Sequence, residues 1–370
     1  MALPTVHLYA GPPRSGRAAR IDEAVLAHWG RAVLLTPTGA YALSREEVLV
    51  LKHPGAGAWG RVVYEFTQFA EALLTGEGAR VRRMGDFERG LLLESGLARC
   101  AAEGKLPAGF TGGDGRFSPG LVRHLLRVIT QLKQAGLEPA EFRTRLERAD
   151  GLSERDTLIA EVYGAYQDAL KAAGAYDVPG LYWEAEARCK AIAPAILEGL
   201  DALLLDGFDD FTPSQFRLIA AMAPHVETLV FGVNHDDAPG RQDLFRISAQ
   251  AIDLIRNTFD VTPVFFEAPS AKRQHEYAAD HFLWRDEPAA QSGLAPSLSL
   301  LPCADPRQEM ETIGRRVKAL LRGGVAAGEI AVVYRNLAMV ADELRGVFEE
   351  FGVPCKIQHR PALLESGLGG

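Results

Sequence analysis

Apolar and polar positions repeat with two different periods along this chain, and the switches between them predict alternating strands and helices. In the first 75 residues, short apolar runs of strand length are each followed by a stretch with helical spacing. The predicted strands are residues 6–10, 31–36 and 61–65, and the predicted helices are 21–29, one opened by the capping box Ser44–Glu47, and 66–74. Strands that alternate with helices predict a parallel sheet covered on both faces, so the fold class is α/β.

Between about residues 76 and 195 the pattern becomes almost wholly helical. Ser118 and Pro119 indicate a helix start, because serine caps a helix and proline suits its first position. Ser153 caps a second helix, which we expect to end at Gly174. We interpret this region as a helical insertion in the α/β domain.

The α/β pattern then resumes and divides the rest of the chain into two parts. Strands are predicted at 203–205 and 227–233, with a helix from Thr212 to Met222 between them. A stretch rich in Pro, Ala, Ser and Gly indicates a linker. The predicted organisation is 1–75 and 196–286 for one α/β domain, 76–195 for its insertion, 287–297 for the linker, and 298–370 for the start of a second, incomplete α/β domain. In that second domain we expect strands at 298–301, 329–334 and 353–357 and helices at 310–321 and 338–351.

Composition narrows the class of protein without identifying it. Of 370 residues, 47% are apolar and 24% charged, as in ordinary globular domains, and the formal net charge of −8 argues against a generally basic coat for nucleic acid. The four cysteines form no CxxC pair, which favours reduced thiols in the cytoplasm. The N-terminus lacks a signal pattern and no apolar run is long enough to span a membrane, so we expect no membrane partner.

The segment Gly11–Ala18, GPPRSGRA, lies between the first predicted strand and helix, where a phosphate-binding loop belongs. Its glycine spacing is that of G-x-x-x-x-G-K-[ST], in which backbone N–H groups and a helix N-terminus hold a phosphate. Arg17 replaces the lysine, and its planar fork does not fit the space of an ammonium. Ala18 replaces the hydroxyl that binds magnesium. The alternative is a tight turn without a ligand.

Asp206 ends the apolar run of the segment LLLDGFDDFTPSQ, at the expected edge of the sheet. In a nucleotide-dependent motor such an acid holds magnesium, and a neighbouring carboxylate orients the attacking water. Here Gly207 follows Asp206, so Asp209 or Asp210 would have to supply that second carboxylate from the following turn. The alternative is that Asp206 is an acid at a strand end without a ligand, and that Asp209 and Asp210 lie near the positive, N-terminal end of the next helix.

Arg335 follows EIAVVY, at the carboxyl end of a predicted strand in the second domain. An arginine offered across a domain cleft can sense the γ-phosphate of a nucleotide. A surface arginine paired with a nearby acid is the alternative.

Taken in order, these segments resemble those of a known family. GPPRSGRA, LLTPT, LLLDGFDDFTPSQ, FGVNHDD and EIAVVYRN…FEEFGVPCKIQHRPAL are similar to the motifs of superfamily 1 helicases of the UvrD type. The form of the acidic segment is more similar to that of AddB, the helicase-like nuclease subunit of the AddAB recombination complex. The resemblance implies a RecA-like domain with a 1B-like helical insertion, followed by the start of a 2A-like second RecA-like domain.

The resemblance also assigns residues to roles. It implies Gly11, Gly16, Arg17, Gln215 and Arg335 for a vestigial nucleotide site, Asp206 for magnesium, and Thr36 and Thr38 for single-stranded DNA. The sequence departs from the family pattern at Arg17, Ala18 and Gly207. Because all three departures fall on catalysis, ATP and magnesium are doubtful cofactors for this region. Gln215 equally suits a capping box at the start of its helix.

The leading hypothesis is an ATPase-inactive scaffold of an AddB-type subunit that acts in double-strand-break repair. The expected partners are single-stranded or end-resected DNA and an AddA-type motor subunit. A PD-(D/E)XK nuclease with an iron–sulfur cluster is expected only beyond residue 370. Two alternatives stay open, an active superfamily 1 ATPase and a non-catalytic protein-interaction module.

Overall fold

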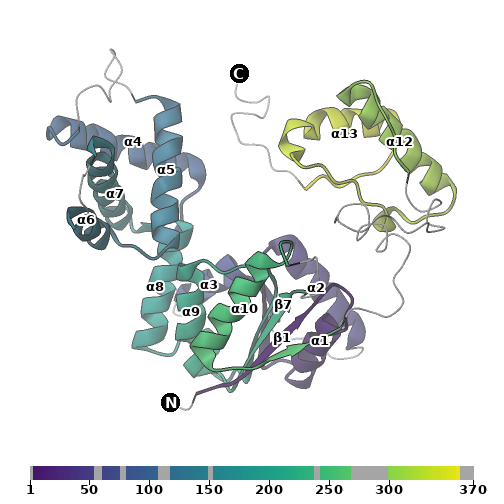
Figure 1. Cartoon of the computed structure of the whole chain (residues 1–370), viewed down its shortest axis with the longest axis horizontal. Helices are drawn as coiled ribbons and strands as arrows, with labels where there is room; N and C mark the ends of the chain where they lie inside the picture. The colour runs from purple at the N-terminus through teal and green to yellow at the C-terminus, as the bar shows by residue number, and fades with distance from the viewer. Residues whose placement is uncertain are drawn as a thin grey trace. The chain divides into compact units, whose positions relative to one another are not determined.

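The computed structural model describes residues 3–53, 61–75, 81–106, 117–148, 153–236, 242–267 and 299–358. The chain divides into two compact units, Met1–Ala271 and Lys272–Gly370 (Figure 1). The linker expected at 287–297 and the strand start at 298 lie outside the described residues.

Unit 1 contains a six-stranded sheet with the strand order β3-β2-β6-β7-β1-β8. All of its strand pairs are parallel. The strands are β1 (Thr5–Gly11), β2 (Ala32–Thr36), β3 (Val63–Glu65), β6 (Ala202–Phe208), β7 (Thr228–Asn234) and β8 (Pro263–Phe265). This sheet confirms the predicted α/β class and is consistent with a RecA-like domain.

Helices cover both faces of the sheet, as its apolar strands require. All five residues of β2 are buried, and so is most of β6. One face packs against α1 (Arg17–Ala27) and α2 (Gly39–Lys52). The other packs against α3 (Phe66–Thr75), α8 (Val178–Ala191), α9 (Pro213–Met222) and α10 (Arg246–Phe259) (Figure 1).

Four described helices between α3 and α8 form a second apolar core of their own. They are α4 (Asp86–Ala102), α5 (Pro119–Gln134), α6 (Pro139–Glu147) and α7 (Glu154–Ala172). Two helix starts are confirmed by their caps: Ser118 Oγ accepts from the N–H of Leu121, and Ser153 Oγ from that of Asp156, each at 3.2 Å. The short strands β4 (Arg82–Arg83) and β5 (Ala175–Tyr176) pair beside this core.

The predicted start of α2 at Ser44 is wrong. The helix begins at Gly39, because Thr38 has extended backbone angles and its Oγ1 accepts a hydrogen bond from the N–H of Tyr41 at 3.2 Å. Ser44 lies inside the helix, where its spacing to Glu47 has no capping role. The helix α10 and the edge strand β8 were not predicted.

Unit 2 contains α12 (Pro306–Arg322) and α13 (Ala341–Glu350), which pack through a small core that includes Met310, Val347 and Phe348. These two helices agree with prediction. The segments 299–301, 329–334 and 353–357 do not form the predicted strands within residues 299–358. Their apolar spacing suits a sheet, but a strand also needs a hydrogen-bonded neighbour, and the described part of unit 2 pairs none of them.

Candidate functional site

The loop between β1 and α1 lies where a phosphate loop would, but two of its residues cannot donate a backbone hydrogen bond. Gly16 precedes the helix with φ of 92°, a left-handed conformation that suits glycine. At Gly11 an added Cβ would lie 2.7 Å from the Cβ of Phe266, so the backbones approach closely there. Pro12 and Pro13 have no N–H, so the loop lacks two of the backbone donors that wrap a phosphate.

Arg17 and Asp206 bind one another. Nη1 of Arg17 lies 2.6 Å from Oδ1 of Asp206, and the two residues are 8% and 0% exposed. The sequence indicated both residues as partners of a nucleotide and its magnesium. In this structure the guanidinium lies on the carboxylate that a magnesium ion would use.

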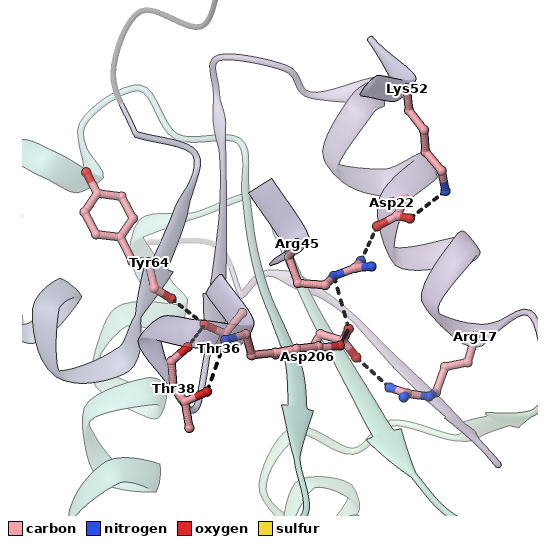
Figure 2. A network of polar contacts seen from close by, with 9 residues as sticks. Arg17, Asp22, Thr36, Thr38, Arg45, Lys52, Tyr64 and Asp206 are labelled. Atoms are coloured by element: carbon pink, nitrogen blue, oxygen red, sulfur yellow. Dashed lines mark hydrogen bonds and ion pairs between the residues drawn. The ribbon is translucent and has the colours of Figure 1, made fainter. Parts of the chain in front are cut away.

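A second arginine and a second acid extend this pair into a network (Figure 2). Arg45, from α2, lies 3.7 Å from Oδ2 of Asp206 and also pairs with Asp22 of α1. Lys52, at the end of α2, lies 2.7 Å from the other oxygen of Asp22. Three cationic side chains and two carboxylates therefore link both helices of this face to strand β6.

Tyr41 occupies the space beside Gly207. Its hydroxyl donates to Oδ2 of Asp206 at 2.8 Å. Burial, and then the neighbouring Asp206 carboxylate, raise the pKa of Tyr41 to about 12. Gly207 has φ of 83°, and an added Cβ would lie 2.5 Å from Cε1 of Tyr41. A glutamate at this position therefore cannot be accommodated while Tyr41 stays in place.

Gly232, on the neighbouring strand β7, leaves room for the ion pair. It is the register partner of Asp206. A Cβ at Gly232 would lie 2.8 Å from both Arg17 Nη1 and Asp206 Oδ1. Packing against the ion pair therefore explains why the FGV segment has a glycine at position 232, which the strand pattern alone did not indicate.

Thr36 and Thr38 lie at the carboxyl end of β2, next to the network (Figure 2). Thr36 is fully buried, and its hydroxyl lies 3.1 Å from the carbonyl oxygen of Tyr64 and 3.3 Å from that of Thr38. Thr38 is exposed and caps α2. Gln215 forms the capping box of α9, since its Oε1 accepts from the backbone N–H of Thr212 at 3.0 Å.

The other sequence candidates are not members of this network. Arg335 is exposed and belongs to unit 2. Asp209 and Asp210 are exposed in the turn after β6, where Asp210 accepts from the N–H of Phe211 at 2.7 Å. In the described residues neither makes a hydrogen bond or ion pair with Asp206 or its partners.

The side chains around Asp206 fit a guanidinium better than a magnesium ion. Magnesium takes oxygen ligands in octahedral geometry, whereas both Asp206 oxygens already accept from protein donors. Ser15 Oγ and Arg17 Nε are buried and have no hydrogen-bond partner among the described residues. Both groups can donate a hydrogen bond, which suits an anion rather than a metal cation. Nowhere in those residues do three His, Cys, Asp or Glu side chains gather as a metal site.

Sequence reasoning missed Tyr41, Arg45, Asp22, Lys52 and Gly232. A helical signal for three of them was present, because Tyr41, Arg45 and Lys52 follow one another at intervals of four and seven along one helix face. Their partners could not be read from that spacing, since Asp206 lies on strand β6 and Asp22 on helix α1. No described helix is both long enough and apolar enough to cross a membrane.

Comparison with known proteins finds a matching family model and relatives much longer than this chain. A family model described as "ADDB, N-terminal" matches residues 20–284. A curated relative from Desulforudis audaxviator, named as one subunit of an ATP-dependent helicase/deoxyribonuclease, is 25% identical over 89% of this chain and 29% of its own length. A relative of the same name from Heliobacterium modesticaldum is 26% identical over 84% of this chain and 27% of its own. The chain thus spans little more than a quarter of these relatives.

Proposed function

The chain belongs to the family described as "ADDB, N-terminal", and we propose that it is the DNA-binding scaffold of an AddB-type helicase–nuclease, built around a nucleotide site that does not hydrolyse ATP. The buried ion pair of Arg17 with Asp206 carries this proposal. In it, 76–195 corresponds to a 1B-like insertion and 298–370 to the start of a 2A-like domain. The protein acts in the cytoplasm in double-strand-break repair.

Three features support the absence of hydrolysis. Asp206 is neutralised from within the protein, so magnesium would have to displace two arginines and a tyrosine. Gly207 offers no carboxylate to orient the attacking water, and Tyr41 excludes one. Ala18 supplies no hydroxyl to the metal.

The carboxyl end of the sheet supports the assignment of single-stranded DNA as the ligand. Ligands of open α/β sheets bind outside the carboxyl ends of the strands. Pro37, Thr38 and Ala40 are exposed there, directly after β2. Tyr41 connects this segment to the Arg17–Asp206 network, because it contacts both Thr38 and Asp206. In the proposal the network holds the DNA-binding segment in one arrangement, and no nucleotide is needed to set it. The motor partner in this proposal is an AddA-type subunit.

The decisive experiment measures ATP turnover by the 370-residue chain with and without single-stranded DNA. We expect turnover equal to that of Asp206→Ala, because the described residues around Asp206 form no intact hydrolytic site. The variant Arg17→Lys/Ala18→Ser should gain none, since Gly207 and Tyr41 are unchanged. Turnover that Asp206→Ala abolishes would establish the active superfamily 1 ATPase and overturn the scaffold.

A second measurement tests the DNA-binding role against that of a protein-interaction module. Binding of a fluorescent oligonucleotide should weaken as salt rises, because phosphate contacts release counterions. Absence of binding at low salt would favour the interaction module.

A further inference from the structure

The helices α4 to α7, called here the helical subdomain, are joined to the sheet of unit 1 at a junction that is not apolar. Their apolar core shares no described residue with either of the cores that cover the sheet. The chain passes between the two parts twice, through the two-residue strands β4 and β5, which pair with one another. Two short crossings alone would let the subdomain pivot, so other contacts must set its angle to the sheet.

A fully buried ion pair lies at this junction. Lys133 is in the last turn of α5, and Asp177 caps the start of α8. Both residues are 0% exposed, and Lys133 Nζ lies 2.6 Å from Asp177 Oδ1. The ammonium also donates to Oε1 of Gln167 on α7 at 2.8 Å, and it lies 5.1 Å from the ring centre of Trp183 on α8. The pair therefore connects the subdomain directly to a helix that packs on the sheet.

The Asp177 carboxylate has protein donors on both of its oxygens. Oδ1 also accepts from the N–H of Gly180 at 2.9 Å, and Oδ2 accepts from the hydroxyl of Tyr166 on α7 at 3.1 Å. An added Cβ at Gly180 would lie 2.7 Å from Asp177 Oδ1 and 3.1 Å from Lys133 Nζ, so α8 approaches the pair closely. A buried polar network whose hydrogen bonds are all made within the protein is rigid.

Arg217 of α9 makes a second contact with the same end of α5 (Figure 1). Its Nη1 lies 3.5 Å from the carbonyl oxygen of Gly136, which follows α5, and its Nε lies 3.3 Å from Oε2 of Glu186 on α8. An added Cβ at Gly136 would lie 2.7 Å from the guanidinium carbon. Because α9 begins just after the strand that contains Asp206, this contact ties the subdomain to the acidic end of the sheet.

We propose that the Lys133–Asp177 pair is a latch that fixes the angle between the helical subdomain and the sheet. Apolar side chains of similar volume usually give as much stability as a buried ion pair, or more. What the charged pair adds is direction, since its hydrogen bonds are met in one arrangement only. Without it the subdomain pivots about β4 and β5 while both parts stay folded. This role does not depend on DNA binding.

The test is double electron–electron resonance on the 370-residue chain, with spin labels at Ser95→Cys on α4 and Asn257→Cys on α10, both exposed positions. Cys303 and Cys355 are replaced by serine. Cys100 and Cys189 stay, because they are buried and burial raises the pKa of both thiols, so the reactive thiolate is scarce. The measured quantity is the width of the distance distribution between the two labels.

The decisive variant is Lys133→Met/Asp177→Asn. Methionine keeps the apolar length of the side chain, and asparagine still caps α8. We expect roughly double the width of the parent distribution, because β4 and β5 then act as a hinge, and helix content unchanged by circular dichroism. The control Glu103→Gln/Lys105→Met removes an exposed ion pair next to α4 and should leave the width unchanged.

Arg217→Gln tests the junction from α9, at a side chain that is 45% exposed and tolerates substitution. It should broaden the distribution less than the double variant, because the Lys133–Asp177 pair remains. The latch is overturned if the double variant keeps the parent width or if the control broadens the distribution equally. Loss of helix content in the double variant also overturns it, since the pair would then be needed for folding itself. An unchanged width in Arg217→Gln would remove α9 from the latch.

Discussion

The ion pair of Arg17 with Asp206 makes a quantitative prediction about stability. Arg17→Met removes the cation and leaves a fully buried carboxylate, while Asp206→Leu leaves a buried guanidinium. Breaking one side of a buried pair costs about 3–5 kcal/mol. We expect about 3 kcal/mol for each single variant, at the lower end of that range. In Arg17→Met, Tyr41 and Arg45 still lie against the carboxylate, and in Asp206→Leu the Arg17 side chain, which is 10% exposed, retains some access to water.

The double variant Arg17→Met/Asp206→Leu should be far less harmful than the sum of its parts. It removes both charges and keeps similar volumes, so the main remaining defect is the Tyr41 hydroxyl without its acceptor, about 1–2 kcal/mol. The expected coupling free energy is therefore about 4 kcal/mol. Effects that add independently, with coupling below about 0.5 kcal/mol, would refute the idea that this pair holds the site together.

The assay is urea unfolding of the chain followed by tryptophan fluorescence, with the free energy of unfolding compared among the four proteins. Arg20→Met is the matched control, because Arg20 lies on the same helix and pairs with Glu23 in an exposed position. Its unfolding midpoint should equal that of the parent. Where a single variant fails to fold, recovery of folded protein in the double variant tests the same coupling.

Three further predictions concern neighbouring groups. Gly207→Ala should lower the free energy of unfolding by about 1–3 kcal/mol in urea titration, because its φ of 83° and the Tyr41 ring both oppose a Cβ; an unchanged midpoint would contradict that packing. Because the pKa of Tyr41 is raised to about 12 in the fold, its contribution to stability should be complete below pH 10 and lost as pH rises towards 12. Tyr41→Phe should remove its share of that loss, measured by urea titration at each pH, while Tyr163 and Tyr166, whose pKa values are also raised by burial, keep theirs. Ala40→Glu should weaken single-stranded DNA binding relative to Ala40→Gln without loss of thermal stability, since an acid in the first turn favours α2, and equal affinities would remove DNA from this edge.

Local signals predicted much of the fold where they were strong. Thr212, Pro213 and Gln215 marked the start of α9 correctly, because cap, proline and capping box agreed. Ser44 and Glu47 showed the same spacing but lay inside α2, since Thr38 had already opened that helix. In unit 2 the apolar spacing predicted strands, but pairing depends on neighbours that local spacing does not reveal.

The site required information that no local pattern carries. Arg17 and Asp206 are 189 residues apart and both stood out in the sequence, yet as partners of a ligand. That they meet depends on the order of β6, β7 and β1 in the sheet, and on the absence of a side chain at Gly232 between them. Tyr41 shares a helix face with Arg45 and Lys52, but that spacing did not mark it as part of a site, because a tyrosine on a helix is ordinarily a packing residue.

The contact of Tyr41 with Gly207 also restricts how this sequence can change over time. If position 207 becomes glutamate first, its side chain clashes with the Tyr41 ring. If position 41 becomes a smaller residue first, Asp206 loses the hydrogen bond that Tyr41 donates. Each intermediate is less stable than its starting point, and a domain has only about 5–15 kcal/mol to lose. Substitutions that remove the nucleotide chemistry therefore accumulate easily, whereas its recovery requires several substitutions at the same time.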